Sequence, residues 1–557
     1  MRESLALGAL LVAVPWGFHA RAAEPVRARH AMVVTREAHA TDAGVAVLRA
    51  GGNAVDAAVA VGFALAVTLP AAGNIGGGGF MLLRFTDGRT TFVDFRERAP
   101  KKASRDMYLG PDGNPTKDSE AGHLAAGVPG TVRGLELAHR KYGKKPWAGL
   151  LTPAVSLARD GFSVSYGLAR SLRASRLLAR FPESRRIFQR DGAYYEAGER
   201  FRQPELAGTL DRIARSGAAD FYEGETARRL AAGMAANGAL ITLEDLRQYS
   251  AVEREPLRGR YRGYEILTAP PPSSGGTGIL QMMGVLEKSG YEKHGAGSAA
   301  SIHFVAETMR RFFAARNAYL ADPDYVRVPV AGLLDKRYVA KLRESIDPER
   351  ATPSSEVSAL DPAGYESSET THYSIVDAQG NAASVTYTIN GGYGCGVTAP
   401  GLGFLLNNEM DDFTAKPGSP NAAGLVQGEA NAIQPGKRPL SSMTPTIVLR
   451  DGRLFLVAGS PGSGRIISTV LEVLLNVIDF GMNVRDAVDR PRFHHQWKPD
   501  TLFMEPGFSP DTLALLRGRG HTVETVSGIG EAAAILAEGG WLQGAADSRS
   551  EGKASGY

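Results

Sequence analysis

The sequence has little of several features that would narrow its function early. Its 557 residues include a single cysteine, Cys395, so an intrachain disulfide and a structural zinc site built on several cysteines are both excluded. It also lacks an excess of one charge, because 63 Lys and Arg against 59 Asp and Glu give a net charge of +4. That small excess gives no indication of nucleic-acid binding. Stability must therefore come from the packing of a large core.

Long apolar runs are also scarce, and only two stand out. Residues 5–14 form an unbroken apolar run that is followed by Ala20-Arg21-Ala22, a pattern typical of leader-peptide cleavage. We interpret residues 1–22 as a signal peptide and expect an exported protein, periplasmic or extracellular; an uncleaved anchor is the alternative. The second run, residues 54–69, follows Asn53, which is a favourable helix cap. It is too short for a typical membrane span, so it predicts a buried helix.

The order of helix and strand patterns indicates the fold class. Residues 33–100 alternate between the two, residues 120–350 are mostly helical in pattern, and residues 345–369 are an exposed linker in our interpretation. From residue 370 onward β-branched and aromatic runs predict a hairpin over residues 371–377 and 383–390, with further strands at 446–449 and 454–457. Helices combined with antiparallel strands in one body favour a layered α+β fold.

Several local motifs have an ordinary structural explanation. The glycine-rich residues 73–79 lack the Gly-Lys-Ser/Thr of a phosphate loop, so we interpret them as a tight turn with close backbone approach. His494-His495 lacks a third ligand at suitable spacing and is interpreted as packed structure, as is Cys395. The acidic run 409–412 lacks calcium-loop spacing, and composition leaves open whether it is a solvated turn or binds a cationic group.

The more informative feature is Thr370, which follows the linker and begins a predicted strand. A threonine hydroxyl is a weak nucleophile unless a base lies beside it. When the threonine is the first residue of a chain, its own α-amino group is such a base, with a reference pKa of about 7.7–8.0. An internal threonine gains that amine only when the preceding bond, here Glu369–Thr370, is cut. Thr-Thr at the start of a strand is nevertheless common, so spacing alone does not decide.

Seven ordered runs make the chain resemble the γ-glutamyltranspeptidases from about residue 32 to residue 557. They are Asp94-Phe95-Arg96-Glu97 with Ala99-Pro100; Gly127-Val128-Pro129-Gly130-Thr131; Pro271-Pro272-Ser273-Ser274-Gly275-Gly276-Thr277; Thr370-Thr371-His372-Tyr373-Ser374; Leu405-Leu406-Asn407-Asn408-Glu409-Met410-Asp411-Asp412-Phe413; Lys437-Arg438-Pro439-Leu440-Ser441-Ser442-Met443; and Gly459-Ser460-Pro461-Gly462. So many matches in one order are far more specific than any single motif.

The resemblance implies an N-terminal-nucleophile hydrolase fold, a four-layer αββα sandwich. It implies self-cleavage between Glu369 and Thr370 into a large subunit, residues 23–369, and a small subunit, residues 370–557, which stay together as a heterodimer. The freed Thr370 would attack the γ-glutamyl amide of glutathione or a related compound. Water or an amino acid or dipeptide acceptor would then receive the γ-glutamyl group. We expect no metal, no organic cofactor, no nucleic-acid partner and no membrane span after leader removal.

The resemblance also assigns residues to substrate recognition. A γ-glutamyl group carries an α-carboxylate and an α-ammonium, so its pocket needs charges of both signs. Arg96 resembles the arginine that binds the α-carboxylate, which a guanidinium does bidentately. Ser441 and Ser442 match the hydroxyls that also hold the α-carboxylate. Asp412, Glu409 and Asn390 match the groups that bind the α-ammonium. This assignment favours recognition over a solvated turn for the acidic run.

Catalytic roles follow from the same resemblance. Thr388 matches the residue whose hydroxyl contacts the amine of the nucleophile and helps to activate it, and Gly462 with Ser463 aligns with the backbone N–H pair of an oxyanion hole. Ser463 stands where the family commonly has a second glycine, which adds a Cβ where a positive φ is expected. A lid loop, residues 417–428, has Ala422-Ala423 where some relatives carry an aromatic, which suggests a more open pocket.

Two other functions compete with γ-glutamyl transfer. A glutaryl-type β-lactam side-chain acylase uses the same fold, but its substrate lacks an α-ammonium, so the retained Asp412 disfavours it. An inactive exported binding protein on the same scaffold is disfavoured by the retention of Thr370, Thr388, Arg96 and Asp412. We therefore expect an active γ-glutamyltransferase and glutathione hydrolase.

Overall fold

The computed structural model describes residues 23–357 and 370–557, and two seven-stranded sheets form its centre. The first sheet has the order β1 (Val26–Ala28), β18 (Trp541–Ala546), β17 (Ala533–Glu538), β13 (Arg453–Gly459), β12 (Thr446–Arg450), β9 (Tyr264–Thr268) and β8 (Leu257–Tyr261). The second has the order β19 (Lys553–Gly556), β2 (Met32–Thr35), β10 (Thr371–Val376), β11 (Ala382–Thr388), β3 (Gly78–Arg84), β4 (Thr90–Asp94) and β7 (Val252–Arg254). All neighbouring strands in both sheets are antiparallel.

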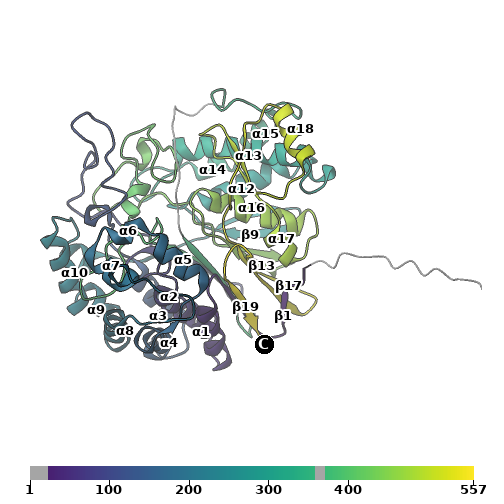
Figure 1. The fold of residues 1–557 in the computed structure, drawn as a ribbon. Coiled ribbons are helices and arrows are strands. Elements are labelled where there is room, and N and C mark those ends of the chain that lie inside the picture. The colour runs from purple at the N-terminus through teal and green to yellow at the C-terminus, as the bar shows by residue number, and fades with distance from the viewer. Residues whose placement is uncertain (1–22, 358–369) are drawn as a thin grey trace, which may run out of the picture.

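Helices cover the outer face of each sheet. The second sheet is covered by α1 (Ala38–Arg49), α2 (Ala54–Thr68) and α3 (Thr131–Tyr142), and the first by α12 (Gly275–Leu286), α16 (Arg465–Ile478) and α17 (Val484–Asp489). In Figure 1 the purple and blue helices gather on one side of the strands and the teal to yellow helices on the other. The predicted four-layer αββα sandwich is therefore confirmed.

The remaining elements extend these layers. Beside α1–α3 lie α4 (Trp147–Asp160), α5 (Tyr166–Ala174), α6 (Arg176–Ala179), α7 (Pro182–Gln189), α8 (Pro204–Ser216), α9 (Ala218–Tyr222), α10 (Glu225–Ala236), α11 (Leu243–Gln248) and the small sheet of β5 (Phe162–Ser163) and β6 (Arg200–Phe201). On the other side lie α13 (Ala299–Tyr319), α14 (Val330–Leu333), α15 (Lys336–Glu344), α18 (Pro510–Gly518) and the three-stranded sheet of β14 (Phe493–His494), β15 (Leu502–Met504) and β16 (Val523–Thr525).

The predicted buried helix is α2, in which every residue is buried. Asn53 caps it, because its side chain accepts from the N–H groups of Val55 and Asp56 at 3.1 and 3.0 Å. Helix α2 packs directly on strands β10 and β11. Its apolar surface therefore supports the strands that follow Thr370 and lead to Thr388.

Strands β10 and β11 form the predicted hairpin, and their side chains alternate between two environments. Tyr373 points toward α2, where its hydroxyl donates to the carbonyl of Ala58 at 3.0 Å. His372 lies on the opposite face, between the sheets, with its ring nitrogens 2.9 Å from Thr386 Oγ1 and 3.0 Å from Ser374 Oγ. Burial lowers the pKa of His372 to about 3, so this ring is neutral near pH 7.

The structure corrects two features of the sequence interpretation. Residues within 252–268, placed in a mostly helical region, form strands β7, β8 and β9 instead. Residues 345–357 are not an exposed linker throughout, because Ser354 is buried and its N–H donates to Asp500 Oδ2 at 2.7 Å. The leader, residues 1–22, and the end of the linker, residues 358–369 with Glu369, lie outside the described residues. Among the described helices, none combines the length and apolar character needed to cross a membrane.

Candidate active site

The hydroxyls of Thr370 and Thr388 lie at one end of the central hairpin. Thr371 pairs with Tyr387 in the β10–β11 register, so Thr370 lies next to Thr388, the last residue of β11. Their Oγ1 atoms are 3.2 Å apart, and Thr388 Oγ1 also accepts the N–H of Asn390 at 2.7 Å. Arg36 Nη1 donates to the Thr370 carbonyl at 3.2 Å. The two predicted catalytic hydroxyls are thus in contact and buried.

The glycine-rich turn, residues 73–79, packs against this end of the hairpin at the carbonyl of Thr388. Asn74 Nδ2 donates to the carbonyl of Thr388 at 2.9 Å. A Cβ on Gly77 would lie 2.0 Å from that same carbonyl oxygen, so no larger residue fits there. The turn is therefore a site of close backbone approach, in agreement with the interpretation made from sequence.

A compact cluster of charged side chains lies beside the two threonines. Arg96 follows β4, and its guanidinium pairs through Nη1 with Glu409 and through Nη2 with Asp412 at 2.5 Å. Glu97 Oε2 lies 3.6 Å from Arg96 Nη1. Glu409 and Asp412 are the ends of a short 3-10 helix, η4 (Glu409–Asp412), which follows Asn408, whose carbonyl accepts from Asn390 Nδ2 at 3.0 Å. The chain thus places one arginine among three carboxyl groups.

Burial and mutual contact shift the pKa values of this cluster. Burial alone would lower the pKa of Arg96, but the charges of Glu409, Asp412 and Glu97 outweigh it and raise the pKa above its usual value. Burial raises the pKa of Glu97 to about 7, against the opposing effect of Arg96. Burial likewise raises the pKa of Glu409 well above its usual range. Glu97 and Glu409 therefore compete for one guanidinium, and their raised pKa values favour protonation of one of these two groups near neutral pH.

Ser441 and Ser442 line the same cavity as Glu409 and Asp412 of η4. The N–H of Ser441 donates to the carbonyl of Pro272 at 2.8 Å, and its Oγ accepts the N–H of Met443 at 3.1 Å. Ser442 Oγ accepts from Arg316 Nη2 at 3.1 Å. The Pro-Pro-Ser-Ser run thus holds the serine pair in place through the backbone.

Gly462 and Ser463 lie in the turn that leads into α16. Their φ angles are 128° and 49°, so Ser463 does have a positive φ although it carries a Cβ, at a cost of about 1 kcal/mol. Within the described parts of the chain, neither backbone N–H has a hydrogen-bond acceptor. Free N–H groups before a helix can stabilise an anion.

These residues enclose one small cavity. It has a volume of about 10 Å³, and its lining includes every residue predicted for the site except Glu369 and Gly462, with Leu425, Met443 and Ile466 added. Leu425 belongs to the lid loop, residues 417–428, so an aliphatic side chain covers a site for which the sequence suggested a more open pocket. That volume holds roughly one water molecule.

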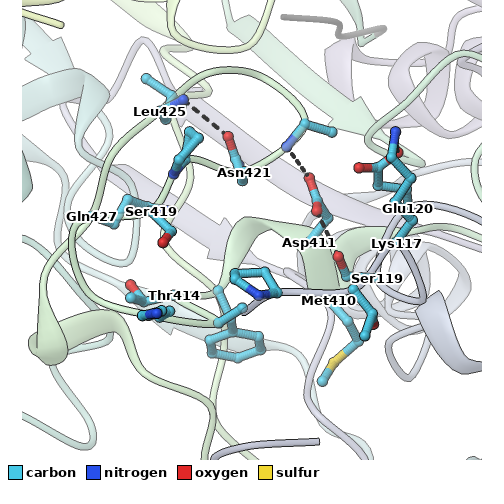
Figure 2. A pocket seen from close by; sticks show the side chains of 17 residues that line it. Lys117, Ser119, Glu120, Met410, Asp411, Thr414, Ser419, Asn421, Leu425 and Gln427 are labelled. Atoms are coloured by element: carbon cyan, nitrogen blue, oxygen red, sulfur yellow. Dashed lines mark hydrogen bonds and ion pairs between the residues drawn. The ribbon is translucent and has the colours of Figure 1, made fainter. Parts of the chain in front are cut away.

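A larger cavity of about 450 Å³ lies on the other side of the lid loop. Figure 2 shows Asp411 between this loop and Ser119: its carboxylate accepts the N–H of Ala422 at 3.0 Å and the Ser119 hydroxyl at 2.8 Å. Burial raises the pKa of Asp411 to about 7, and its bond from Ser119 opposes that shift. Asp411 therefore fastens the lid, whereas its neighbour Asp412 contacts both the lid, by accepting from Asn421 Nδ2 at 3.2 Å, and Arg96 in the small cavity.

The motifs that were set aside from sequence are packed inside the protein. His494 contacts Ser468 Oγ at 2.6 Å and Gln496 Oε1 at 2.9 Å through its ring nitrogens. Cys395 is buried, and burial raises the pKa of its thiol to about 12. Within the described residues, no group of three or more His, Cys, Asp or Glu side chains is arranged to hold a metal ion.

Comparison with known proteins identifies the family. The γ-glutamyltranspeptidase family model matches residues 40–557. The chain belongs to the γ-glutamyltranspeptidase family. It is 51% identical to the glutathione hydrolase proenzyme of Escherichia coli strain K12 over 96% of this chain and 93% of that protein.

Solved structures confirm the fold of this γ-glutamyltranspeptidase. The cephalosporin acylase from Bacillus halodurans has a TM-score of 0.84 and 27% identity, covering 98% of this chain and 99% of that one. The Helicobacter pylori γ-glutamyltranspeptidase has 44% identity and a TM-score of 0.57, covering 58% of this chain and 93% of that one. The N-terminal-nucleophile hydrolase fold expected from sequence is therefore confirmed.

Three residues near the γ-glutamyltranspeptidase site were not assigned a role from sequence. Glu97 was part of a matched motif but received no function, Asp411 was taken only as part of an acidic run, and Arg316 was not singled out. Arg316 contacts Ser442 across 126 positions of the chain. Only the fold brings such partners together, although the regular helical pattern over residues 299–319 would have placed Arg316 on α13.

Proposed function

We propose that the chain is a self-processing γ-glutamyltransferase and glutathione hydrolase in which Thr370 is the nucleophile. The observation that carries this proposal is the contact between the Thr370 and Thr388 hydroxyls beside the charged cluster of Arg96, Glu409 and Asp412. A hydroxyl nucleophile next to charges of both signs suits an amide whose acyl part is an amino acid. The 51% identity to a glutathione hydrolase proenzyme supports it independently.

Processing begins with the Thr370 hydroxyl in the intact chain. Its oxygen attacks the carbonyl of Glu369, and the Glu369–Thr370 peptide bond breaks as an ester forms. Water then opens the ester, so that residues 23–369 end in a carboxylate and residues 370–557 begin with a free amine. This amine becomes the base that withdraws the proton from the Thr370 hydroxyl in every later cycle.

Substrate recognition is an exchange of partners within the charged cluster. The α-carboxylate of the γ-glutamyl group takes the Arg96 guanidinium and the hydroxyls of Ser441 and Ser442. Asp412 and Glu409, released from Arg96, bind the α-ammonium together with the side chain of Asn390. The α-carboxylate takes the place of the acidic pair beside Arg96, and the α-ammonium takes the place of Arg96 beside the acidic pair. Because the two substrate charges cancel, binding adds no net charge to the buried site.

Acyl transfer then follows in two steps. Thr370 Oγ attacks the γ-carbonyl, the backbone N–H groups of Gly462 and Ser463 stabilise the oxyanion, and the amine portion leaves after receiving a proton. Thr388, 3.2 Å from the nucleophile, keeps the Thr370 side chain oriented toward the substrate. Water or the amine of an amino acid or dipeptide then attacks the γ-glutamyl ester and releases the enzyme.

The finer assignments of location and subunits belong to the same proposal. Residues 1–22 act as a leader and are removed, and the protein works outside the cytoplasm. The two products of processing remain together as a heterodimer. The chain needs neither a metal nor an organic cofactor for these steps, because the base and the nucleophile belong to one residue.

A glutaryl-type acylase is the second candidate function, and the similarity to the Bacillus halodurans cephalosporin acylase supports it. The acidic pair of Glu409 and Asp412 disfavours it. A glutaryl group has no ammonium, so those carboxylates would face it without a partner.

The test compares wild-type protein with Thr370→Ala. The wild type should run as two fragments on denaturing electrophoresis, the smaller one beginning at Thr370, and should hydrolyse γ-glutamyl p-nitroanilide. Thr370→Ala should remain one chain with activity lower by on the order of 10⁵-fold or more, because both processing and acylation need this hydroxyl. A variant that still cleaves at this bond, or an uncut wild type with full activity, would overturn the proposal.

A further inference from the structure

Behind the predicted carboxylate pocket lies a second buried arginine, Arg316. It belongs to the last turn of α13 and is 2% exposed. Its Nε donates to Ser274 Oγ at 2.9 Å and its Nη2 to Ser442 Oγ at 3.1 Å. Ser274, from the Pro-Pro-Ser-Ser run, in turn donates to the carbonyl of Ser441 at 2.7 Å. One guanidinium thus holds both serines of the recognition pair, one directly and one through Ser274.

Within the described residues, the charge of Arg316 has no carboxylate partner of its own. Over residues 23–357 and 370–557, its hydrogen bonds go to neutral hydroxyls and it forms no ion pair. Several other buried arginines do have such partners; Arg311, on the same helix, pairs with Glu307 Oε2 at 2.6 Å. Burial lowers the pKa of Arg316 to about 10, with Asp412 opposing the shift and Arg96 adding to it. A buried, unpaired cation is costly unless an anion arrives to balance it.

The hydrogen-bond direction at Ser442 shows where that anion would lie. Because Arg316 donates to Ser442 Oγ, the Ser442 hydroxyl proton is left to point elsewhere, and in the described chain it has no protein acceptor. Ser442 lines the small cavity together with Arg96 and Thr370. A carboxylate in that cavity would accept the Ser442 proton and feel the positive charge one hydroxyl away.

We propose that Arg316 is a positioning residue for substrate selection: it orients the Ser442 hydroxyl as a donor and supplies the second positive charge that selects substrates bearing an α-carboxylate. This inference rests on the proposed function. Arg96 meets the carboxylate directly, whereas Arg316 acts through Ser442 and, by way of Ser274, through the Ser441 backbone. Loss of Arg316 should therefore appear mainly as a higher KM, because the α-carboxylate is remote from the bond that breaks.

Three p-nitroanilides test the proposal, because they separate the two charges of the substrate. The γ-glutamyl compound carries both charges, the glutaryl compound lacks the ammonium, and the 4-aminobutyryl compound lacks the carboxylate. Arg316→Gln should lower kcat/KM roughly 10- to 100-fold for the first two, mainly by raising KM, as expected for the loss of a charge-assisted contact. For the 4-aminobutyryl compound the change should stay below about 2-fold. Arg316→Lys should fall between wild type and Arg316→Gln.

A double-mutant cycle gives a second readout that does not depend on measuring activity with the 4-aminobutyryl compound. If Arg316 acts through Ser442, Arg316→Gln should cost little further activity in a Ser442→Ala background. Arg311→Gln is the matched control: it removes a buried guanidinium from the same helix and should leave the ratios among the three substrates unchanged. If Arg316→Gln and Arg316→Lys fail to give processed protein, Ser274→Ala replaces them and should show the same selectivity in weaker form.

The outcomes separate this inference from the proposed function. Equal loss on all three substrates, or additive effects in the cycle, would make Arg316 a purely structural residue and overturn the inference. Wild-type protein inactive on the γ-glutamyl compound would instead contradict the proposed function.

Discussion

The two ends of the small cavity differ in how they are built. At the nucleophile end, Thr370 and Thr388 contact each other through neutral hydroxyls, and the nearby ring of His372 is neutral because burial lowers its pKa to about 3. At the recognition end, Arg96 is enclosed by Glu409, Asp412 and Glu97. We call this the neutral end because the nucleophile that we propose takes its base from the amine created by chain cleavage, and Arg36 donates to the Thr370 backbone carbonyl rather than to its hydroxyl. The charged end must hold both signs in advance, because the substrate brings both.

This difference has an energetic basis. Neutral hydroxyls cost little to bury when they are hydrogen-bonded to each other, whereas buried charges are stable only while every partner is present. Substitutions at the charged end should therefore alter which substrates are accepted, and substitutions at the neutral end should alter rate with little change in selectivity. Three variants examine this contrast.

The largest effect is expected from Asp412→Asn. The change keeps the shape but removes one charge that the α-ammonium needs, so kcat/KM for γ-glutamyl p-nitroanilide should fall on the order of 100-fold. The glutaryl compound should lose much less, so the ratio between the two substrates should move toward glutaryl. Asp411→Asn is the matched control, since Asp411 faces the lid and Ser119. An unchanged ratio in Asp412→Asn would mean that the charged end does not determine substrate choice.

A moderate effect is expected from Thr388→Ala. Loss of its hydroxyl removes the 3.2 Å contact with Thr370 and should lower kcat roughly 10-fold, with similar losses for γ-glutamyl and glutaryl substrates. Thr388→Ser retains the hydroxyl and should recover most of the rate. Steady-state kinetics on both substrates would check this, and a strong change in their ratio would contradict the division between the two ends.

The smallest effect is expected from Ser463→Gly. Glycine relieves the positive φ of 49° at this position, but it also gains freedom in the unfolded chain, so stability should change by less than about 1 kcal/mol. The backbone N–H remains, and kcat should stay within about 2-fold of wild type. Thermal unfolding and kcat would measure the two effects. A loss of rate beyond 10-fold would show that the serine side chain itself takes part.

Local patterns predicted much of this molecule, and long-range partners account for most of what they missed. The buried helix α2, the hairpin after Thr370 and the α+β class followed from apolar runs and β-branched content. Strands β8 and β9 escaped notice because β8 is a short edge strand with Gly259 at its centre and Arg258 and Arg260 exposed on either side, a composition that does not favour a strand. The linker interpretation was incomplete because the partner of Ser354, Asp500, is distant in sequence.

The candidate site divides in the same way. Thr370, Arg96 and Asp412 stood in motifs that the sequence displays directly, and the structure brings them around one cavity. Arg316 has no local signal, because a lone arginine in a helix is usually solvated. Only its burial and its contact with Ser442 distinguish it.

The strand order has a consequence for the cut that we propose before Thr370. Strand β2 lies between β10 and β19, and β9 lies beside β12, so strands from before and after the proposed cut are neighbours in both sheets. Strands of each piece therefore form hydrogen-bonded pairs with strands of the other piece. When two differently labelled preparations are mixed under native conditions, their large and small subunits should not exchange. Exchange of subunits should require denaturant followed by renaturation.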